Sequence, residues 1–158
     1  MIATVDYWSV GSTSLETASN TRGWSESAWK GAGSGCTPFE PEPTWQHDTL
    51  CLISKTVADV AAVADPNTGV AMYDSYNEQG WLVGGGTSAA SPIIAGVYAL
   101  AANENHLHYA RGLHVFHHSL FDVIHGSNGH CGGSPLCNAG PGYDGPTGNG
   151  TPNGIGAF

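Results

Sequence analysis

A serine two residues after a run of glycines is the residue of this sequence best placed to do chemistry. Ser88 comes after residues 84–86, Gly-Gly-Gly, where a strand-like segment gives way to an apolar stretch that reaches Ala102. The glycines leave room for a substrate backbone, and a helix N-terminus offers partial positive charge and free N–H groups. These groups can stabilise an oxyanion that forms beside an attacking serine hydroxyl. Spacing alone nevertheless favours a simpler role, because serine is also a preferred helix N-cap.

The order of residues around Ser88 favours the chemical role. Residues 86–92, Gly-Thr-Ser-Ala-Ala-Ser-Pro, resemble the nucleophile motif Gly-Thr-Ser-x-x-x-Pro of the subtilisin-like serine peptidases. Residues 57–70, 120–129 and 140–154 resemble the sedolisin branch of these enzymes, the serine-carboxyl peptidases of the kumamolisin type. The resemblance runs in order from about residue 7 to residue 158. It implies an α/β fold, a subtilisin-like parallel sheet with flanking helices, and a serine-type endopeptidase that acts on proteins or peptides.

The resemblance supplies only one catalytic residue for this chain. In sedolisins a glutamate activates the serine, an aspartate supports that glutamate, and a second aspartate takes part in the oxyanion hole. Only the nucleophile has a match here, at Ser88. A carboxylate base works where its pKa lies near the operating pH, so the resemblance implies an acid-acting enzyme. Asp59, Asp65 and Asp74 match or border positions that we interpret as structural.

We therefore expect residues 1–158 to be a single, partial peptidase domain, truncated at the N-terminus and inactive on its own. The alternative is a catalytically inactive, calcium-stabilised remnant or binding module. Residues 1–6 have neither a basic region nor an apolar core, so no signal peptide is expected in them. The full-length family member is expected to be extracellular. Strands missing from the sheet would expose an edge and an apolar face, through which copies of the chain could self-associate.

A Gly- and Pro-rich tail that begins near Phe121 needs something other than an apolar core to order it. Asp122 and Asp144 can supply two carboxylates, and residues 140–142, Gly-Pro-Gly, can turn backbone carbonyls inward. Composition alone favours ordinary turns at both aspartates. The match to the sedolisin calcium site reverses that preference and implies one calcium ion. Its ligands would be the side chains of Asp122 and Asp144, the carbonyls of Val123, Gly140 and Gly142, and water.

Two other groups of residues have metal-binding chemistry but favour other roles. The four cysteines form two local pairs, Cys36 with Cys51 and Cys131 with Cys137, without zinc-finger spacing. Two disulfides in an oxidising compartment are the better interpretation. Five histidines crowd residues 106–118, and a zinc or nickel site is the less favoured alternative to an exposed connector. These histidines are His106, His108, His114, His117 and His118.

Composition limits the partners of the chain. It has 158 residues, 41% of them hydrophobic, which allows a buried core in one domain. Four lysines and arginines stand against 13 acidic residues, for a net charge of -9. This charge repels phosphate backbones and argues against nucleic-acid binding. No apolar run reaches the roughly 18 to 20 residues of a membrane span, so no membrane partner is expected.

The elements expected around these residues follow from local patterns. A short strand is predicted over residues 3–10, ended by residues 11–12. Residues 12–52 are predicted to form an ordered surface loop whose tryptophans dock onto the body of the domain. Strands are predicted within 56–64, 70–76 and 80–83, with a turn at 65–69. The apolar segment that ends at Ala102 is predicted to be a helix with Pro92 in its first turn. Because this helix is apolar all round, we expect it to be buried.

Overall fold

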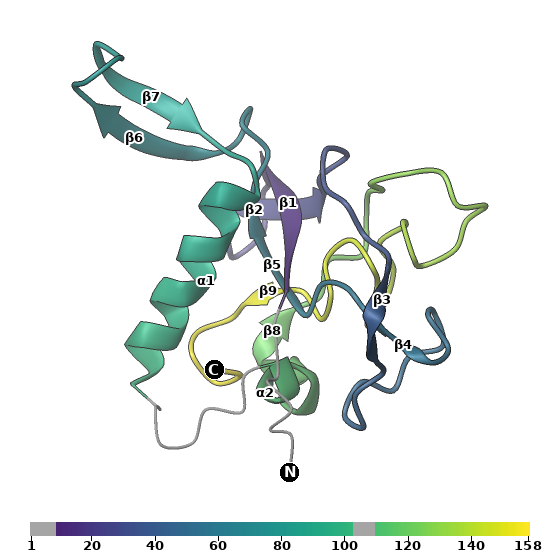
Figure 1. Ribbon diagram of the computed structural model, residues 1–158. Coiled ribbons are helices and arrows are strands. Elements are labelled where there is room, and N and C mark those ends of the chain that lie inside the picture. Colours follow the sequence, from purple (N-terminus) through teal and green to yellow (C-terminus); the bar gives the residue numbers. More distant parts are fainter. Residues whose placement is uncertain (1–8, 103–109) are drawn as a thin grey trace.

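The computed structural model describes residues 9–102 and 110–158, and a three-stranded mixed sheet lies at its centre (Figure 1). The strand order is β2-β1-β5, formed by β2 (Trp24–Ala28), β1 (Val10–Thr17) and β5 (Val60–Val63). β1 pairs in parallel with β5, from Val10 opposite Val60 onward, and antiparallel with β2. The sheet is therefore mixed, whereas a parallel sheet was predicted.

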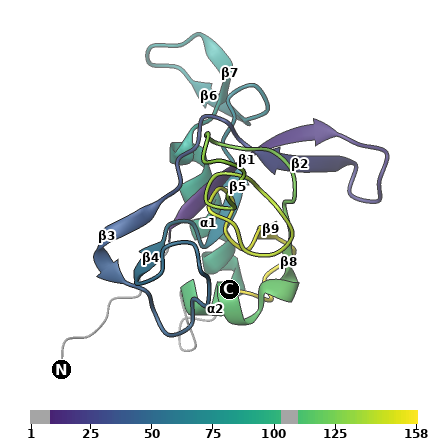
Figure 2. The ribbon, with the colours of Figure 1, turned by 90° about the vertical axis from the view of Figure 1, so that its right-hand side faces the viewer.

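Helix α1 (Thr87–Ala101) packs on one side of β1 and β5, and the loop of residues 122–150 lies on the other side (Figures 1 and 2). The core between sheet and helix is built from small and branched side chains, among them Val60, Ala90 and Ile94. Leu113 and Phe158 complete it from the C-terminal part of the chain. Ala90 and Ile94 are four residues apart and lie on one face of the helix, which is the face that packs.

Two antiparallel pairs extend from this centre. β6 (Val70–Asp74) and β7 (Gly80–Gly84) form a hairpin that projects from the body and leads into α1 (Figure 1). β3 (Cys36–Pro41) and β4 (Ser54–Thr56) form the second pair. The disulfide Cys36–Cys51 closes the segment between them.

The C-terminal third contains little regular structure beyond α2 (Ala110–Val115), a 3-10 turn at His117–Ser119, and the short pair β8 (Leu120–Phe121) and β9 (Thr151–Pro152). The intervening loop is tied to the sheet by backbone hydrogen bonds from Ser12 to Pro146 and from Ala61 to Gly150. The disulfide Cys131–Cys137 closes a turn within that loop. All four cysteines are thus paired as predicted.

Several predicted elements are confirmed at their predicted places. The strands at 70–74 and 80–84 and the helix that ends at Ala101 agree within a few residues with the prediction. The turn at 65–69 forms through a hydrogen bond from the Thr68 N–H to the Asp65 carbonyl. No helix of the described ranges is long and apolar enough to cross a membrane.

Other expectations about the elements are wrong. The strand predicted over 3–10 falls mostly outside the described residues, and β1 continues through residues 11–12, where the strand was expected to end. β1, β2 and β3 occupy much of the segment predicted as a loop. Pro92 lies inside α1 rather than in its first turn, so the Ser88 carbonyl receives no i+4 hydrogen bond from it.

Helix α1 is also less buried than predicted. Only Ala89, Ala90 and Ile94 are buried in it, and Leu100 is 77% exposed. Within the described residues, nothing covers the outer face of the helix. The apolar composition of this segment predicted the helix correctly, but it does not imply that other parts of the chain cover every face of the helix.

Candidate functional site

Ser88 is the second residue of α1, and its side chain is exposed. The N-cap of this helix is Gly86, with φ 85° and ψ 170°, and no side chain makes a capping hydrogen bond there. The Gly86 carbonyl accepts hydrogen bonds from Ala89 and Ala90. The role that spacing alone favoured, a serine N-cap, is therefore wrong for Ser88.

Gly85 and Gly86, which precede Ser88, have different structural roles. A Cβ on Gly85 would lie 2.6 Å from the Ala64 carbonyl oxygen and from Pro66, so this glycine lets the end of β7 pack closely on the turn after β5. A Cβ on Gly86 would meet nothing closer than the Ser88 nitrogen at 3.9 Å. The space beside the helix N-terminus is thus open at Gly86. Because α1 begins here, the N–H groups of Thr87 and Ser88 come before the first hydrogen bonds of the helix.

The nearby carboxylates in the sequence are engaged elsewhere. Asp65 accepts hydrogen bonds from the Asn67 N–H at 2.9 Å and from the Ser14 hydroxyl at 2.8 Å, which lower its pKa. Asp74 accepts one from the Tyr76 N–H at 2.7 Å on the hairpin. In the part of the chain that the structure describes, no hydrogen bond joins a carboxylate to Ser88. Among the described residues, no carboxylate is therefore in hydrogen-bond contact with this serine.

Asp59 is the centre of a buried charged cluster. Its Oδ1 lies 2.8 Å from Lys55 Nζ and 3.1 Å from His114 Nε2, and its Oδ2 accepts the Ser9 N–H at 2.7 Å. Burial raises the pKa of Asp59, but the hydrogen bond from His114 and the charge of Lys55 lower it more, so the pKa lies below its usual range. Asp59 therefore acts as a structural anion, as predicted.

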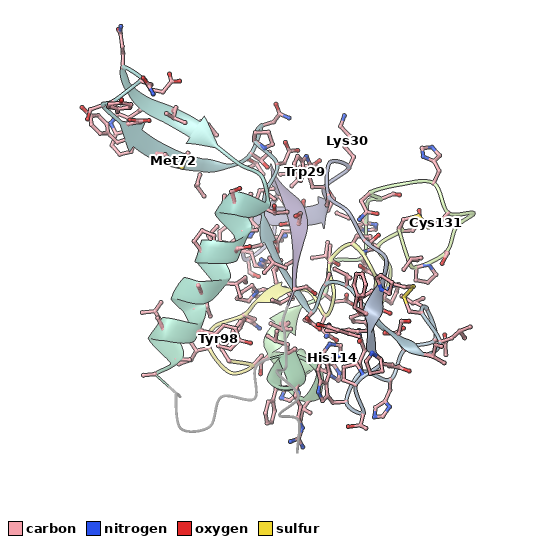
Figure 3. The ribbon with its side chains drawn as sticks, in the orientation of Figure 1. Trp29, Lys30, Met72, Tyr98, His114 and Cys131 are labelled. Atoms are coloured by element: carbon pink, nitrogen blue, oxygen red, sulfur yellow. A yellow bond between two sulfur atoms is a disulfide. The ribbon has the colours of Figure 1, made fainter. Side chains whose placement is uncertain are left out.

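His114 corrects the prediction for the histidine-rich segment. It lies on the side of α2 toward β3 and β4 (Figure 3), with a nearly buried side chain, whereas an exposed connector was predicted. His117 and His118 are exposed as predicted, and His106 and His108 lie outside the described residues. The missed signal was helical spacing, because Ala110, Leu113 and His114 share one face of α2.

The predicted cation ligands come together in the C-terminal loop. Asp144 is 1% exposed, and its carboxylate accepts hydrogen bonds from the N–H groups of Thr147 at 2.9 Å and Gly140 at 3.0 Å. Asp122 accepts the Gly142 N–H at 2.8 Å, so both carboxylates hold the same Gly-Pro-Gly turn. Val123, beside Asp122, is buried.

The electrostatics of this loop favour a positive charge. Burial raises the pKa of Asp144 to about 6, hydrogen bonds from Gly140 and Thr147 oppose that shift, and the charge of Asp122 adds to it. Two carboxylates that repel each other on one glycine-rich turn have the charge and the oxygen ligands that calcium prefers. No group of three or more His, Cys, Asp or Glu side chains within the described ranges has the arrangement of a metal site. A cation here would therefore depend on backbone carbonyls as well.

A cavity of about 330 Å³ lies beside this loop, between α2 and the segment that follows β3. Asp122 and Gly142 form part of its wall, with Tyr143 from the same loop and His114 from α2. Trp45, Gln46 and Asp48 line it as well. Ser88 does not line the cavity.

Comparisons with known proteins support one family. The chain is 32% identical to kumamolisin from Bacillus sp. (strain MN-32) over 139 residues, which cover 78% of this chain. It is 32% identical to sedolisin from Pseudomonas sp. (strain 101) over an alignment of 164 residues, which covers 90% of this chain. No family model matches the sequence.

A solved structure agrees with the sequence relatives. Pseudomonas sedolisin, a serine-carboxyl proteinase complexed with two molecules of pseudo-iodotyrostatin, has a TM-score of 0.77 and 31% sequence identity to this chain. The match covers 92% of this chain and 43% of that one. The chain spans 24% of kumamolisin and 26% of sedolisin, about a quarter of the length of these curated relatives.

Proposed function

Because the chain is related to the sedolisin family of serine peptidases over part of its length, we propose that it carries the nucleophile of an acid-acting serine-type endopeptidase. The nucleophile is Ser88, and the substrates are proteins or peptides. The observation that supports this proposal best is the exposed position of Ser88 in the first turn of α1, next to the open space at Gly86.

The geometry suits acyl transfer. Ser88 Oγ adds to the carbonyl carbon of the scissile peptide bond while a general base accepts the hydroxyl proton, and the carbonyl oxygen becomes an oxyanion. Free N–H groups and the partial positive charge of the α1 N-terminus stabilise negative charge formed beside them. The intermediate expels the amine, which takes the proton, and water hydrolyses the ester left on Ser88.

The proposal places the general base outside these 158 residues. Asp59, Asp65 and Asp74 are held by other partners. The glutamate, its supporting aspartate and the oxyanion-hole aspartate would come from a portion of the protein that the relatives contain and this sequence does not match. We therefore expect residues 1–158 alone to leave peptide substrates uncleaved.

Covalent labelling tests the nucleophile. Protein from its native source is treated at about pH 4 with a fluorophosphonate, which requires an activated serine. We expect the label on the tryptic peptide 56–111, at Ser88, and no label on residues 1–158 expressed alone. Ser88→Ala should abolish labelling, and Ser91→Ala, an exposed serine of the same peptide and helix, should leave it unchanged. A native protein that stays unlabelled at Ser88 would contradict the proposal.

The absence of a partner for Ser88 in the described residues favours a second candidate function. In that case the chain is a catalytically inactive, calcium-stabilised remnant or binding module. The same experiment separates the two, because only an activated serine reacts with the probe.

We also propose that the C-terminal loop binds one calcium ion. Asp122 and Asp144 would supply carboxylates, and Val123, Gly140 and Gly142 backbone carbonyls. The proximity of the two carboxylates to one glycine-rich turn supports this site. The two disulfides suit an oxidising compartment, and we propose an extracellular location for the full-length protein.

A further inference from the structure

The wall of the 330 Å³ cavity contains three aromatic rings in contact. The ring centroids of Trp45 and His114 are 4.9 Å apart, and those of His114 and Tyr143 are 5.3 Å apart. Such a volume is within the range of small-molecule sites, which are typically lined by aromatic side chains with a few polar groups. The cavity belongs neither to the surroundings of Ser88 nor to the core.

The charge of the cavity wall is negative. Asp48 and Asp122 line it, and no lysine or arginine does. The ammonium of Lys55 lies 5.5 Å from the Trp45 ring centroid, but it is 2.8 Å from Asp59 and neutralised by it. With its histidines neutral, the cavity therefore favours a cation.

Two side chains of the wall have buried oxygens without a hydrogen-bond partner. Gln46 is 1% exposed, and its Nε2 donates to the Thr56 carbonyl at 3.0 Å and to the Tyr143 hydroxyl at 2.8 Å, while its Oε1 accepts nothing. Asp48 Oδ1 accepts from Leu50 at 2.8 Å and from Thr56 at 2.9 Å, while Oδ2 is buried and unpartnered. Buried acceptors are rarely left without a donor. What these groups lack is a donor, preferably a charged one.

We propose that this cavity binds a primary alkylammonium group. An ammonium carries three donors and no acceptor, which complements the carboxylates of Asp48 and Asp122 in the cavity wall, one oxygen of Asp48 having no partner. Its charge is attracted to the carboxylates and to the Trp45 ring, and its alkyl chain packs on the other rings. The group could belong to a lysine side chain of a peptide or to a free amine. The proposal does not depend on the activity of Ser88.

Calorimetric titration of the full 158-residue chain tests the site. The probe is n-butylammonium chloride in calcium-free buffer at about pH 8, above the usual histidine pKa. Two controls separate charge from donors: n-butanol has the same chain without charge, and tetramethylammonium has charge without N–H groups. We expect saturable binding of n-butylammonium at least about tenfold tighter than that of either control, a difference of about 1.4 kcal/mol. Equal binding of butanol, or no binding of n-butylammonium, overturns the proposal.

Two matched variants test whether n-butylammonium binds at the cavity. Asp48→Asn keeps an oxygen for Leu50 and Thr56 but removes the charge, and it should weaken n-butylammonium binding about tenfold. Asp74→Asn, the same change on the distant hairpin, should leave binding unchanged. If Asp48→Asn fails to fold, the Trp45 indole N–H signal of the unaltered chain should shift on titration, while that of Trp81 on the hairpin should not. Binding that neither depends on Asp48 nor shifts Trp45 contradicts the site.

The source of the ammonium is settled by one further ligand. Nα-acetyl-lysine methylamide presents a lysine side chain within a peptide-like backbone. Binding as tight as that of n-butylammonium supports recognition of lysine in peptides. Binding of n-butylammonium alone supports a free amine. Binding of neither contradicts the proposal.

Discussion

Asp59 connects its own segment to two parts of the chain that are distant in sequence, α2 and the C-terminal loop. Its side chain bonds Lys55 of β4 and His114 of α2, and its backbone carbonyl accepts the N–H of Asn149 at 3.0 Å. A fully buried carboxylate is tolerated because a cation and several donors surround it. The cluster thereby fixes α2 and the C-terminal loop against the end of the sheet.

Removal of the Asp59 charge should strongly destabilise the fold. Asp59→Asn leaves the buried ammonium of Lys55 without a counter-ion, and breaking a buried pair in this way typically costs about 3 to 5 kcal/mol. Urea denaturation measures the loss. Asp74→Asn removes a charge from the hairpin and should change the free energy of unfolding by less than about 0.5 kcal/mol. Equal effects of both substitutions would show that the Asp59 cluster contributes no more than a surface charge.

Asp144 should lower the stability of the fold as pH rises, which is opposite to the usual effect of an aspartate. Its folded-state pKa is raised to about 6, above the ordinary value of 3.8, so the folded state holds a proton that the unfolded state releases between these values. Without calcium, the contribution of Asp144 to stability is therefore lost as pH rises from about 4 to about 6. We expect the difference in melting temperature between this chain and Asp144→Asn to change across that interval. A difference that stays constant with pH would contradict the raised pKa.

At the scale of elements, the start of α1 depends on the backbone of Gly86. Its φ of 85° and ψ of 170° fall in a region that only glycine occupies readily. Gly86→Ala should cost about 1 to 3 kcal/mol even though the added Cβ has space. Gly96→Ala, in the same helix and also in open space, should stabilise the chain by about 0.5 to 1 kcal/mol. Denaturation of both variants measures whether each substitution lowers or raises the free energy of unfolding. A loss of stability in Gly96→Ala would show that the position of the glycine in the helix does not determine this change.

The loop between β8 and β9 should depend on calcium for its order. Chelation should lower the melting temperature, because two carboxylates then repel each other without a cation, and excess calcium should restore it. Scanning calorimetry of the chain with chelator, and then with calcium, gives both values. Asp122→Asn should abolish the response to calcium, whereas Asp74→Asn should keep it. An unchanged melting temperature on chelation would contradict the calcium site.

How well the sequence predicts an element depends on the range of the interactions that form it. The turn at 65–69 and the helix from Thr87 follow from local residues, and both were predicted. β1 runs through Gly11 and Ser12 because it pairs with β5, some 50 residues away, and no local pattern reports that pairing. The nearly buried side chain of His114 was missed for the same reason, since its partner Asp59 is 55 residues away in the sequence.

The same distinction between local and long-range interactions applies to the candidate site. Ser88 and the two loop aspartates were predicted from local motifs, and in the structure the carboxylates of Asp122 and Asp144 both accept hydrogen bonds from one turn. The cavity was not predicted, because Trp45, His114 and Tyr143 come from three separate segments. The exposed face of α1 was missed because apolar composition does not specify what covers a helix.

At the scale of the whole molecule, the α/β class is supported by the likeness to sedolisin, and several regions of the described surface expose apolar side chains. The sheet edges that we expected to be open are partly covered: Ala28 of β2 bonds to the His125 carbonyl and Ala61 of β5 to that of Gly150, both at 2.8 Å. Five of the exposed large apolar side chains instead lie together on the hairpin. We call these residues the hairpin patch: Met72, Tyr73, Tyr76, Trp81 and Val83. Figure 3 shows Met72 on this projecting arm.

The hairpin patch makes self-association of this chain the expected behaviour. Tyr73 and Trp81 are cross-strand partners, 65% and 77% exposed, and burial of such rings against a second copy would remove apolar surface from water. Sedimentation velocity should therefore show a sedimentation coefficient that rises with concentration. The double substitution Tyr73→Ser and Trp81→Ser should remove the rise, whereas Phe39→Ser, which removes a 91% exposed ring on β3, should not. A monomer at every concentration would contradict self-association through the patch. If Phe39→Ser removes the rise in the sedimentation coefficient as fully as the double substitution, the association is nonspecific.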